Sequence, residues 1–304
     1  MWNRRIIQMV KTPVFKGCCT AVVTPFNEQG VDYEQYGKNL EFQYENGVSA
    51  IVVCGTTGEN ATLETNEREE LVRYTVNHVR GRMKVVVGIG SNNTKSALRN
   101  AQSAKALGAD AVLMVTPYYN KSTQAGLIRH FTFVADRVDI PMILYNVPGR
   151  TGIGISADTY YELSKHPNIN GVKEASSDVA LSGAIRSRCG DDLYLWSGND
   201  DCTIPLMSLG ALGVVSVASN ILPGTVSKLC ALCMENDFTG ATELFRKYAR
   251  LFAALFIETN PIPVKAAMKL LGTDSGILRL PLIEITDEHL ALLRNAMQEA
   301  GMNI

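Results

Sequence analysis

The chain has 304 residues, of which 46% are hydrophobic and 19% charged, with a formal net charge of -1. This balance, without a basic stripe or an arginine-rich arm, argues against a nucleic-acid partner. No apolar stretch approaches the roughly 20 residues that a membrane helix needs. The length fits a single α/β barrel with an appendage.

The first residues, 1–14, are interpreted as a short N-terminal extension. They carry positive charge but have neither a long apolar region nor a small-residue cleavage site, so they do not resemble a signal peptide. The seven cysteines are scattered and odd in number, which is typical of reduced thiols in a cytoplasmic protein. Cys230 and Cys233 form a CxxC within a helical pattern, with no second CxxC and no nearby histidine. We therefore expect no metal site.

Short apolar runs alternate with longer amphipathic runs along the chain. Each short run is rich in β-branched residues and apolar on both faces, as a strand covered on both sides should be. The predicted strands are 17–23, 50–53, 85–87, 111–115, 142–145, 169–172, 193–196 and 213–217. The clearest helical patterns between them are 32–45, 66–79 and 94–107, the second opening with a capped, acidic turn at 65–70.

This alternation predicts an α/β fold, a (β/α)8 TIM barrel over residues 15–236. A doubly wound sheet would rarely need so many units in a row. After the last strand only helical patterns follow, and they exceed the single helix that completes a barrel. These patterns, at 225–235, 239–256, 262–271 and 287–300, predict a small C-terminal helical region over 237–304.

Active sites of such barrels lie at the carboxyl ends of the strands. Five of the predicted strand ends carry polar, aromatic or glycine residues, while the other halves of these strands are apolar. These ends are 54–59, 116–120, 145–152, 173–174 and 197–200. Their coincidence at one face of the barrel predicts a site there.

Lys173 is the first candidate, because it ends a buried strand. An ammonium group at that position is poorly solvated, which favours the neutral amine and hence a nucleophile. For an arbitrary lysine, a surface position at a strand end is the commoner explanation. The polar residues at the neighbouring strand ends favour the nucleophile.

An amine nucleophile that forms an imine with a keto acid needs groups for carboxylates and for protons. Turn 55–58 offers backbone N–H groups and the hydroxyls of Thr56 and Thr57 for a small carboxylate; a tight turn with local capping is the alternative. Tyr145 offers a phenol that can act as acid and base; the alternative is an aromatic residue that only packs at the mouth of the barrel. Arg150 lies on a rigid turn and can bind a second carboxylate; the alternative is a solvated arginine of a loop.

Five motifs in order at barrel spacing resemble the dihydrodipicolinate synthase family. This family belongs to the pyruvate-dependent class I aldolases, which also include N-acetylneuraminate lyase. The resemblance runs from about residue 15 to the C-terminal end, and its motifs are 55–59, 117–120, 145–152, 171–174 and 260–265. Each motif alone is weak, whereas the ordered set is specific.

The resemblance implies a catalytic group. Lys173 forms the Schiff base with pyruvate, and Tyr145, Thr56 and Tyr119 form a proton relay, in which Tyr119 reaches into the site of a neighbouring subunit. No cofactor is implied, because the lysine imine itself is the electron sink. The family is commonly a homotetramer, a dimer of dimers.

The resemblance also implies how the substrates bind. Thr57 holds the pyruvate carboxylate, and Arg150 receives the carboxylate of L-aspartate 4-semialdehyde. The backbone at Gly198 and Val215 lines the pocket around Lys173. The presence of Arg150 and of Thr56-Thr57 favours the lysine-pathway reaction over N-acetylneuraminate lyase or another sugar-acid aldolase, which stay the alternative.

Two further alternatives are a keto-acid sensor and a pyridoxal phosphate enzyme. A sensor is expected to lack Lys173, Tyr145 or Arg150, and all three are present. Pyridoxal phosphate needs a phosphate cup, but residues 218–221 lack the usual glycine-rich turn.

Feedback inhibition by lysine is expected to be weak or absent. Inhibited family members use a histidine pair and a glutamate, and the matching positions here hold Thr65, Arg68 and Ser96. Asn92 and Tyr118 remain as a possible remnant of the site. Without the glutamate, the ammonium group of a bound lysine loses its carboxylate partner. Arg68 also adds a charge of the same sign as that ammonium group.

Overall fold

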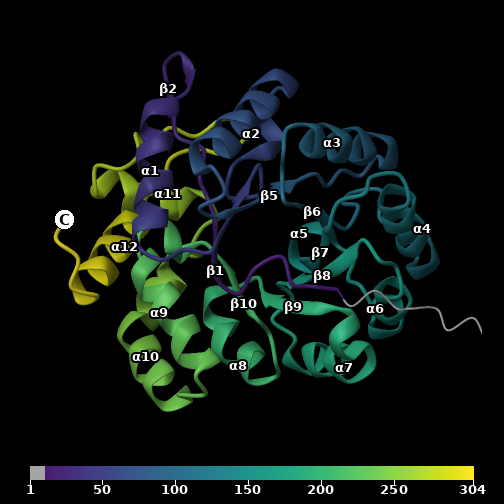
Figure 1. Ribbon diagram of the computed structural model, residues 1–304. Coiled ribbons are helices and arrows are strands. Elements are labelled where there is room, and N and C mark those ends of the chain that lie inside the picture. Colours follow the sequence, from purple (N-terminus) through teal and green to yellow (C-terminus); the bar gives the residue numbers. More distant parts are fainter. Residues whose placement is uncertain (1–10) are drawn as a thin grey trace, which may run out of the picture.

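The computed structural model describes residues 11–304 and shows a closed barrel surrounded by helices (Figure 1). Most of the predicted N-terminal extension, residues 1–10, lies outside the described residues. Within them, no helix is both long enough and apolar enough to span a bilayer.

The barrel consists of parallel strands in the order β1-β10-β9-β8-β7-β6-β5-β4, and it closes where β1 pairs with both β10 and β4. This confirms the predicted (β/α)8 barrel, with strand ends within two residues of the prediction. The strands are β1 (Gly17–Ala21), β4 (Ala50–Val53), β5 (Lys84–Gly88), β6 (Ala111–Val115), β7 (Met142–Asn146), β8 (Ile169–Glu174), β9 (Tyr194–Ser197) and β10 (Gly213–Ser216). An additional antiparallel pair, β2 (Phe26–Asn27) and β3 (Gly30–Val31), is too short to produce a periodic pattern.

Helices follow the strands, and all but the short α5 cover the outside of the barrel. They are α1 (Tyr33–Glu45), α2 (Thr65–Val79), α3 (Thr94–Ala106), α4 (Gln124–Ala135), α5 (Pro148–Thr151), α6 (Ala157–Ser164), α7 (Val179–Cys189), α8 (Thr203–Ser208) and α9 (Pro223–Met234). The cap of α2 lies one residue before its predicted position. Glu64 is the N-cap, and its side chain and that of Glu67 form a reciprocal capping box.

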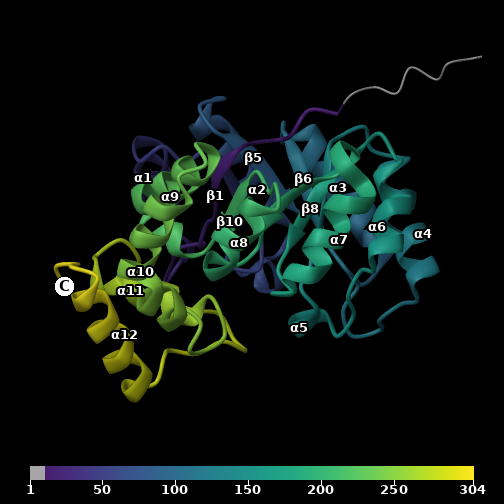
Figure 2. The same ribbon diagram turned by 90° about the horizontal axis from the view of Figure 1, so that it is seen from below.

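Three further helices follow α9, as the sequence predicts: α10 (Phe238–Ala254), α11 (Ile262–Leu270) and α12 (Asp287–Glu299). They lie together beside the barrel (Figure 2), where α10 packs on α8 and α9 and α12 packs on α10 and α11. Cys230 and Cys233 are buried, free thiols of α9.

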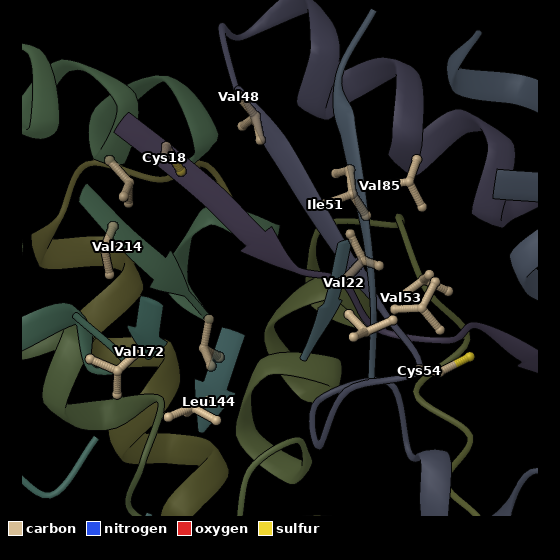
Figure 3. Packing of buried hydrophobic residues seen from close by; sticks show 14 of the residues in the cluster. Cys18, Val22, Val48, Ile51, Val53, Cys54, Val85, Leu144, Val172 and Val214 are labelled. Carbon is tan, nitrogen blue, oxygen red and sulfur yellow. The ribbon is translucent and has the colours of Figure 1, made fainter. Parts of the chain in front are cut away.

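Two apolar layers form the core, because side chains alternate between the two faces of each strand. The outer layer lies between strands and helices, and Figure 3 shows part of it, including Leu144 and Val172. The inner layer fills the barrel and includes Tyr145, Trp196 and Val215. Phe15 stacks on Trp196 with ring centroids 4.8 Å apart. The alternation turns Tyr145 and Lys173, which follow Leu144 and Val172, toward the barrel axis.

Candidate active site

A cavity of about 320 Å³ lies at the carboxyl ends of the barrel strands. Its wall is formed by the ends of β1 and of β4 to β8, by residues 59–62, and by two segments of the C-terminal region, 259–261 and 281–282. The wall includes five of the residues selected from the sequence, namely Lys173, Tyr145, Thr56, Arg150 and Tyr118.

Lys173 is buried in β8, with 6% of its surface exposed. Its Nζ lies 4.4 Å from the ring centroid of Tyr145, which is its register partner on β7. Among residues 11–304 no carboxylate lies within ion-pair distance of this amine. An amine that is buried, unpaired and next to a phenol has the surroundings of a nucleophile with an acid–base partner.

Gly198 leaves room for the lysine side chain. A Cβ at this position would lie 3.1 Å from Lys173 Cε and 2.5 Å from Ala175 Cβ. Val215 is buried in the inner layer of the barrel core. Neither residue is among those that line the cavity, and their role around Lys173 stays a prediction.

A buried polar cluster links β7 and β8 on the faces that point away from the barrel axis. Asn146 Nδ2 donates to both carboxylate oxygens of Glu174, at 3.0 and 2.9 Å, and the Ser176 N–H and the Tyr160 hydroxyl also donate to that carboxylate. Burial raises the pKa of Glu174, and these donors act in the opposite direction. Asn146 and Glu174 are register partners one position beyond Tyr145 and Lys173, so the cluster fixes the register that brings Tyr145 and Lys173 together.

The two threonines after β4 have different positions. Thr56 lines the cavity. Thr57 is 2% exposed and lies behind the wall, where its Oγ1 accepts a hydrogen bond of 2.9 Å from Asn260 Nδ2. Behind the turn, the Thr24 hydroxyl donates to the Gly58 carbonyl at 2.8 Å.

Arg150 stands in α5 at the exposed rim of the cavity. Its Nη2 donates to the backbone carbonyl of Asn260 at 3.1 Å. Arg150 and Lys173 thus line the same cavity, and the guanidinium has donors left for an anionic ligand.

Two more of the selected residues, Tyr119 and Asn92, do not line the cavity. Tyr119 is 91% exposed, with a φ of +65°, and does not line the cavity of its own chain. Asn92 lines a different cavity of about 440 Å³, together with Lys121 and Arg129. Tyr118 lines the cavity of Lys173, and the Asn92 carbonyl accepts a hydrogen bond of 3.0 Å from Asn120 Nδ2, two residues further along; their role as a remnant of a lysine site stays a prediction.

Sequence reasoning assigned no role to three residues next to the site. Asn260 contacts both Thr57 and Arg150, and Lys265 forms a fully buried ion pair of 2.8 Å with Glu59. A signal for the ion pair was present, because Lys265 lies between the apolar residues 262–264 and 266–268 of the helical run.

The fold and the cavity define a (β/α)8-barrel enzyme with a buried lysine at its active-site face. The chain belongs to the Dihydrodipicolinate synthetase family, whose model matches residues 14–300. The 4-hydroxy-tetrahydrodipicolinate synthase of Thermoanaerobacter sp. (strain X514) is 47% identical over 291 residues, which cover 95% of this chain and 98% of that protein.

Solved structures agree with this assignment. The chloride-inhibited dihydrodipicolinate synthase of Acinetobacter baumannii, in complex with pyruvate, superposes with a TM-score of 0.93 at 42% identity, covering 95% of this chain and 99% of the other. A dihydrodipicolinate synthase variant described as the first monomeric one superposes with a TM-score of 0.94 at 42% identity, covering 95% and 98%.

Proposed function

We propose that this chain is a 4-hydroxy-tetrahydrodipicolinate synthase that condenses pyruvate with L-aspartate 4-semialdehyde through an imine on Lys173. The observation that carries the proposal is the buried, unpaired amine of Lys173 next to the Tyr145 ring, in a cavity with Arg150 at its rim. Family membership and the pyruvate complex of the Acinetobacter baumannii relative support the same reaction class.

The reaction begins when the Lys173 amine attacks the keto carbon of pyruvate. The carbinolamine that forms loses one water to give the imine, and Tyr145 carries the protons of these steps, with Thr56 and Tyr119 extending the relay. Loss of a proton from the pyruvate methyl group gives an enamine. The protonated imine serves as the electron sink for this step, so no cofactor is needed.

The enamine carbon then attacks the aldehyde carbon of the second substrate, whose oxygen takes a proton to become the hydroxyl group. The amine of the same substrate attacks the imine carbon, closes the ring and displaces Lys173. The overall change is one water lost and one free lysine regenerated.

The two carboxylates are bound at different places. Thr57 and the adjoining backbone hold the carboxylate of pyruvate, and Arg150 receives that of L-aspartate 4-semialdehyde by paired N–H bonds. Gly198 provides space for the bound lysine side chain, as its close approach to Lys173 Cε supports.

The working assembly is a homotetramer, a dimer of dimers, in the cytoplasm. Tyr119 supports this part of the proposal, because a tyrosine that is 91% exposed and held outward by a positive φ is placed to enter a neighbouring subunit. The relay would then be complete only in the dimer.

A coupled assay tests the proposed function. Purified protein and pyruvate receive either L-aspartate 4-semialdehyde with the downstream NADPH-dependent reductase, or N-acetylmannosamine with product detection by mass spectrometry. We expect NADPH consumption in the first arm only, and its loss in Lys173→Ala. Product in the second arm only would contradict the assignment of Arg150 and favour a sugar-acid aldolase.

A further inference from the structure

The start of α11 and the residue before Pro261 are linked to the Thr56-Thr57 turn and its continuation at two places. Asn260 Nδ2 donates to Thr57 Oγ1 across a sequence separation of 203 residues, and Lys265 Nζ donates to Glu59 Oε1 across 206. Each link joins a residue of the turn or its immediate continuation to the start of α11. The turn and the start of α11 are therefore held as one unit at the mouth of the barrel.

The ion pair is the anchor of this unit. Both side chains are buried, with exposures of 0% and 1%, and Lys265 Nζ also donates to the carbonyls of Thr24 and Ile277. The Lys265 N–H donates to the Pro261 carbonyl at 3.0 Å. The anchor thus lies one helical turn from Asn260 and fixes the backbone on which Asn260 stands.

Asn260 makes contact with both groups that receive substrate carboxylates in the proposed function. Its side chain binds the Thr57 hydroxyl at 2.9 Å, and its backbone carbonyl accepts from Arg150 Nη2 at 3.1 Å. Asn260 is 5% exposed, and its Oδ1 has no hydrogen-bond partner within residues 11–304. The bond to Thr57 is consequently the sole hydrogen bond of this amide in the described part of the chain.

We propose that Asn260 is a positioning residue that couples the two carboxylate receptors, Thr57 and Arg150. The condensation joins the two substrates, so their carboxylates must be held at a fixed spacing while the new carbon–carbon bond forms. A single rigid residue that touches both receptors maintains that spacing. This inference rests on the proposed function, because it assigns a role relative to those two receptors.

The test measures pyruvate capture without the second substrate. Each variant is incubated with increasing pyruvate, reduced with borohydride and analysed by mass spectrometry for the fraction of Lys173 that is modified. In Asn260→Ala the amide is lost and the backbone carbonyl stays. Loss of one buried hydrogen bond predicts a half-saturating pyruvate concentration about fivefold to tenfold higher. The double variant Thr57→Val/Asn260→Ala should be no worse than Thr57→Val alone.

Coupling has a second readout. Arg150→Ala releases the Asn260 carbonyl, so it should also weaken pyruvate capture, by about twofold to threefold, although the proposed function assigns Arg150 to the other substrate. This effect should disappear in the Asn260→Ala background. Asn39→Ala is the matched control, since Asn39 is another buried asparagine that binds the C-terminal region, through the Thr273 carbonyl. It should lower the melting temperature without changing pyruvate capture.

Two results would overturn the inference. One is unchanged pyruvate capture in Asn260→Ala. The other is that the effect of Asn260→Ala on pyruvate capture adds to that of Arg150→Ala or to that of Thr57→Val in the double variants. Absence of any trapped adduct in the wild-type protein would instead contradict the proposed function. The two failures are therefore distinguishable.

Discussion

Tyr145 and Lys173 are register partners on the neighbouring strands β7 and β8, and the lysine Nζ lies 4.4 Å from the centre of the tyrosine ring. Both side chains point into the barrel because the alternation of the strands places Leu144 and Val172 outside. The positions of the proposed acid–base group and the proposed nucleophile are thus set by strand pairing rather than by a loop. A site built on strands is held more precisely than one built on loops.

Tyr145→Phe should therefore separate chemistry from folding. Removal of the phenol oxygen leaves the packed ring but removes the proton carrier, so kcat should fall by roughly 10²-fold to 10⁴-fold. Stopped-flow trapping with borohydride should show slower imine formation, while the melting temperature stays within a few degrees of wild type. An unchanged kcat would remove Tyr145 from the proton relay.

Lys265→Met should be strongly destabilising. It leaves the Glu59 carboxylate buried without its cation, and breaking a buried pair in this way costs about 3–5 kcal/mol. Urea unfolding followed by circular dichroism measures the loss. Glu59→Gln/Lys265→Met removes both charges and should recover part of the stability; a double variant less stable than Lys265→Met would contradict the account of the pair.

Asp274 should make stability depend on pH. Burial raises the pKa of its carboxyl group to about 6 from an ordinary value of 3.8. The native state then holds a proton between these values that the unfolded state has lost. The stability that this group contributes is complete below about pH 4 and is lost as the pH rises through 6.

Asp274→Asn removes this dependence and preserves an acceptor for the Gly276 N–H. The free energy of unfolding of the variant, relative to wild type, should rise with pH between 4 and 6 by about 1 kcal/mol per pH unit, and then level off. Urea unfolding at pH 5 and pH 8 checks this. A relative stability that is the same at both pH values would contradict the raised pKa.

Lysine should inhibit weakly or not at all. Thr65, Arg68 and Ser96 stand where inhibited relatives are expected to have two histidines and a glutamate. Arg68 Nη2 donates to the Gly88 carbonyl at 2.7 Å, so the guanidinium is held at the end of β5. Initial rates with added L-lysine provide the measurement, and an inhibition constant in the range of cellular lysine would contradict the prediction.

Much of the fold could be predicted because it depends on local patterns. The apolar runs of the strands and the periodic helices produced element ends that agree within two residues, and Lys173 and Tyr145 lie where strand ends predict them. The division at 236/237 falls between α9 and α10 and stays a prediction.

Contacts between distant segments could not be predicted in this way. The bond from Asn260 to Thr57 and the pair of Lys265 and Glu59 each join residues more than 200 positions apart. No periodicity specifies such a contact, because it depends on where the C-terminal helices pack on the barrel. Tyr119 is a further case, since its proposed partner is a second chain.

The most direct test of the central claim is borohydride reduction of the protein with pyruvate, followed by peptide mass spectrometry. The account predicts a single reduced pyruvate adduct on Lys173, and none in Lys173→Ala. Lys265, which is buried but held by Glu59 and two carbonyls, should stay unmodified. Absence of an adduct, or an adduct on another lysine, would contradict the assignment of Lys173 as the nucleophile.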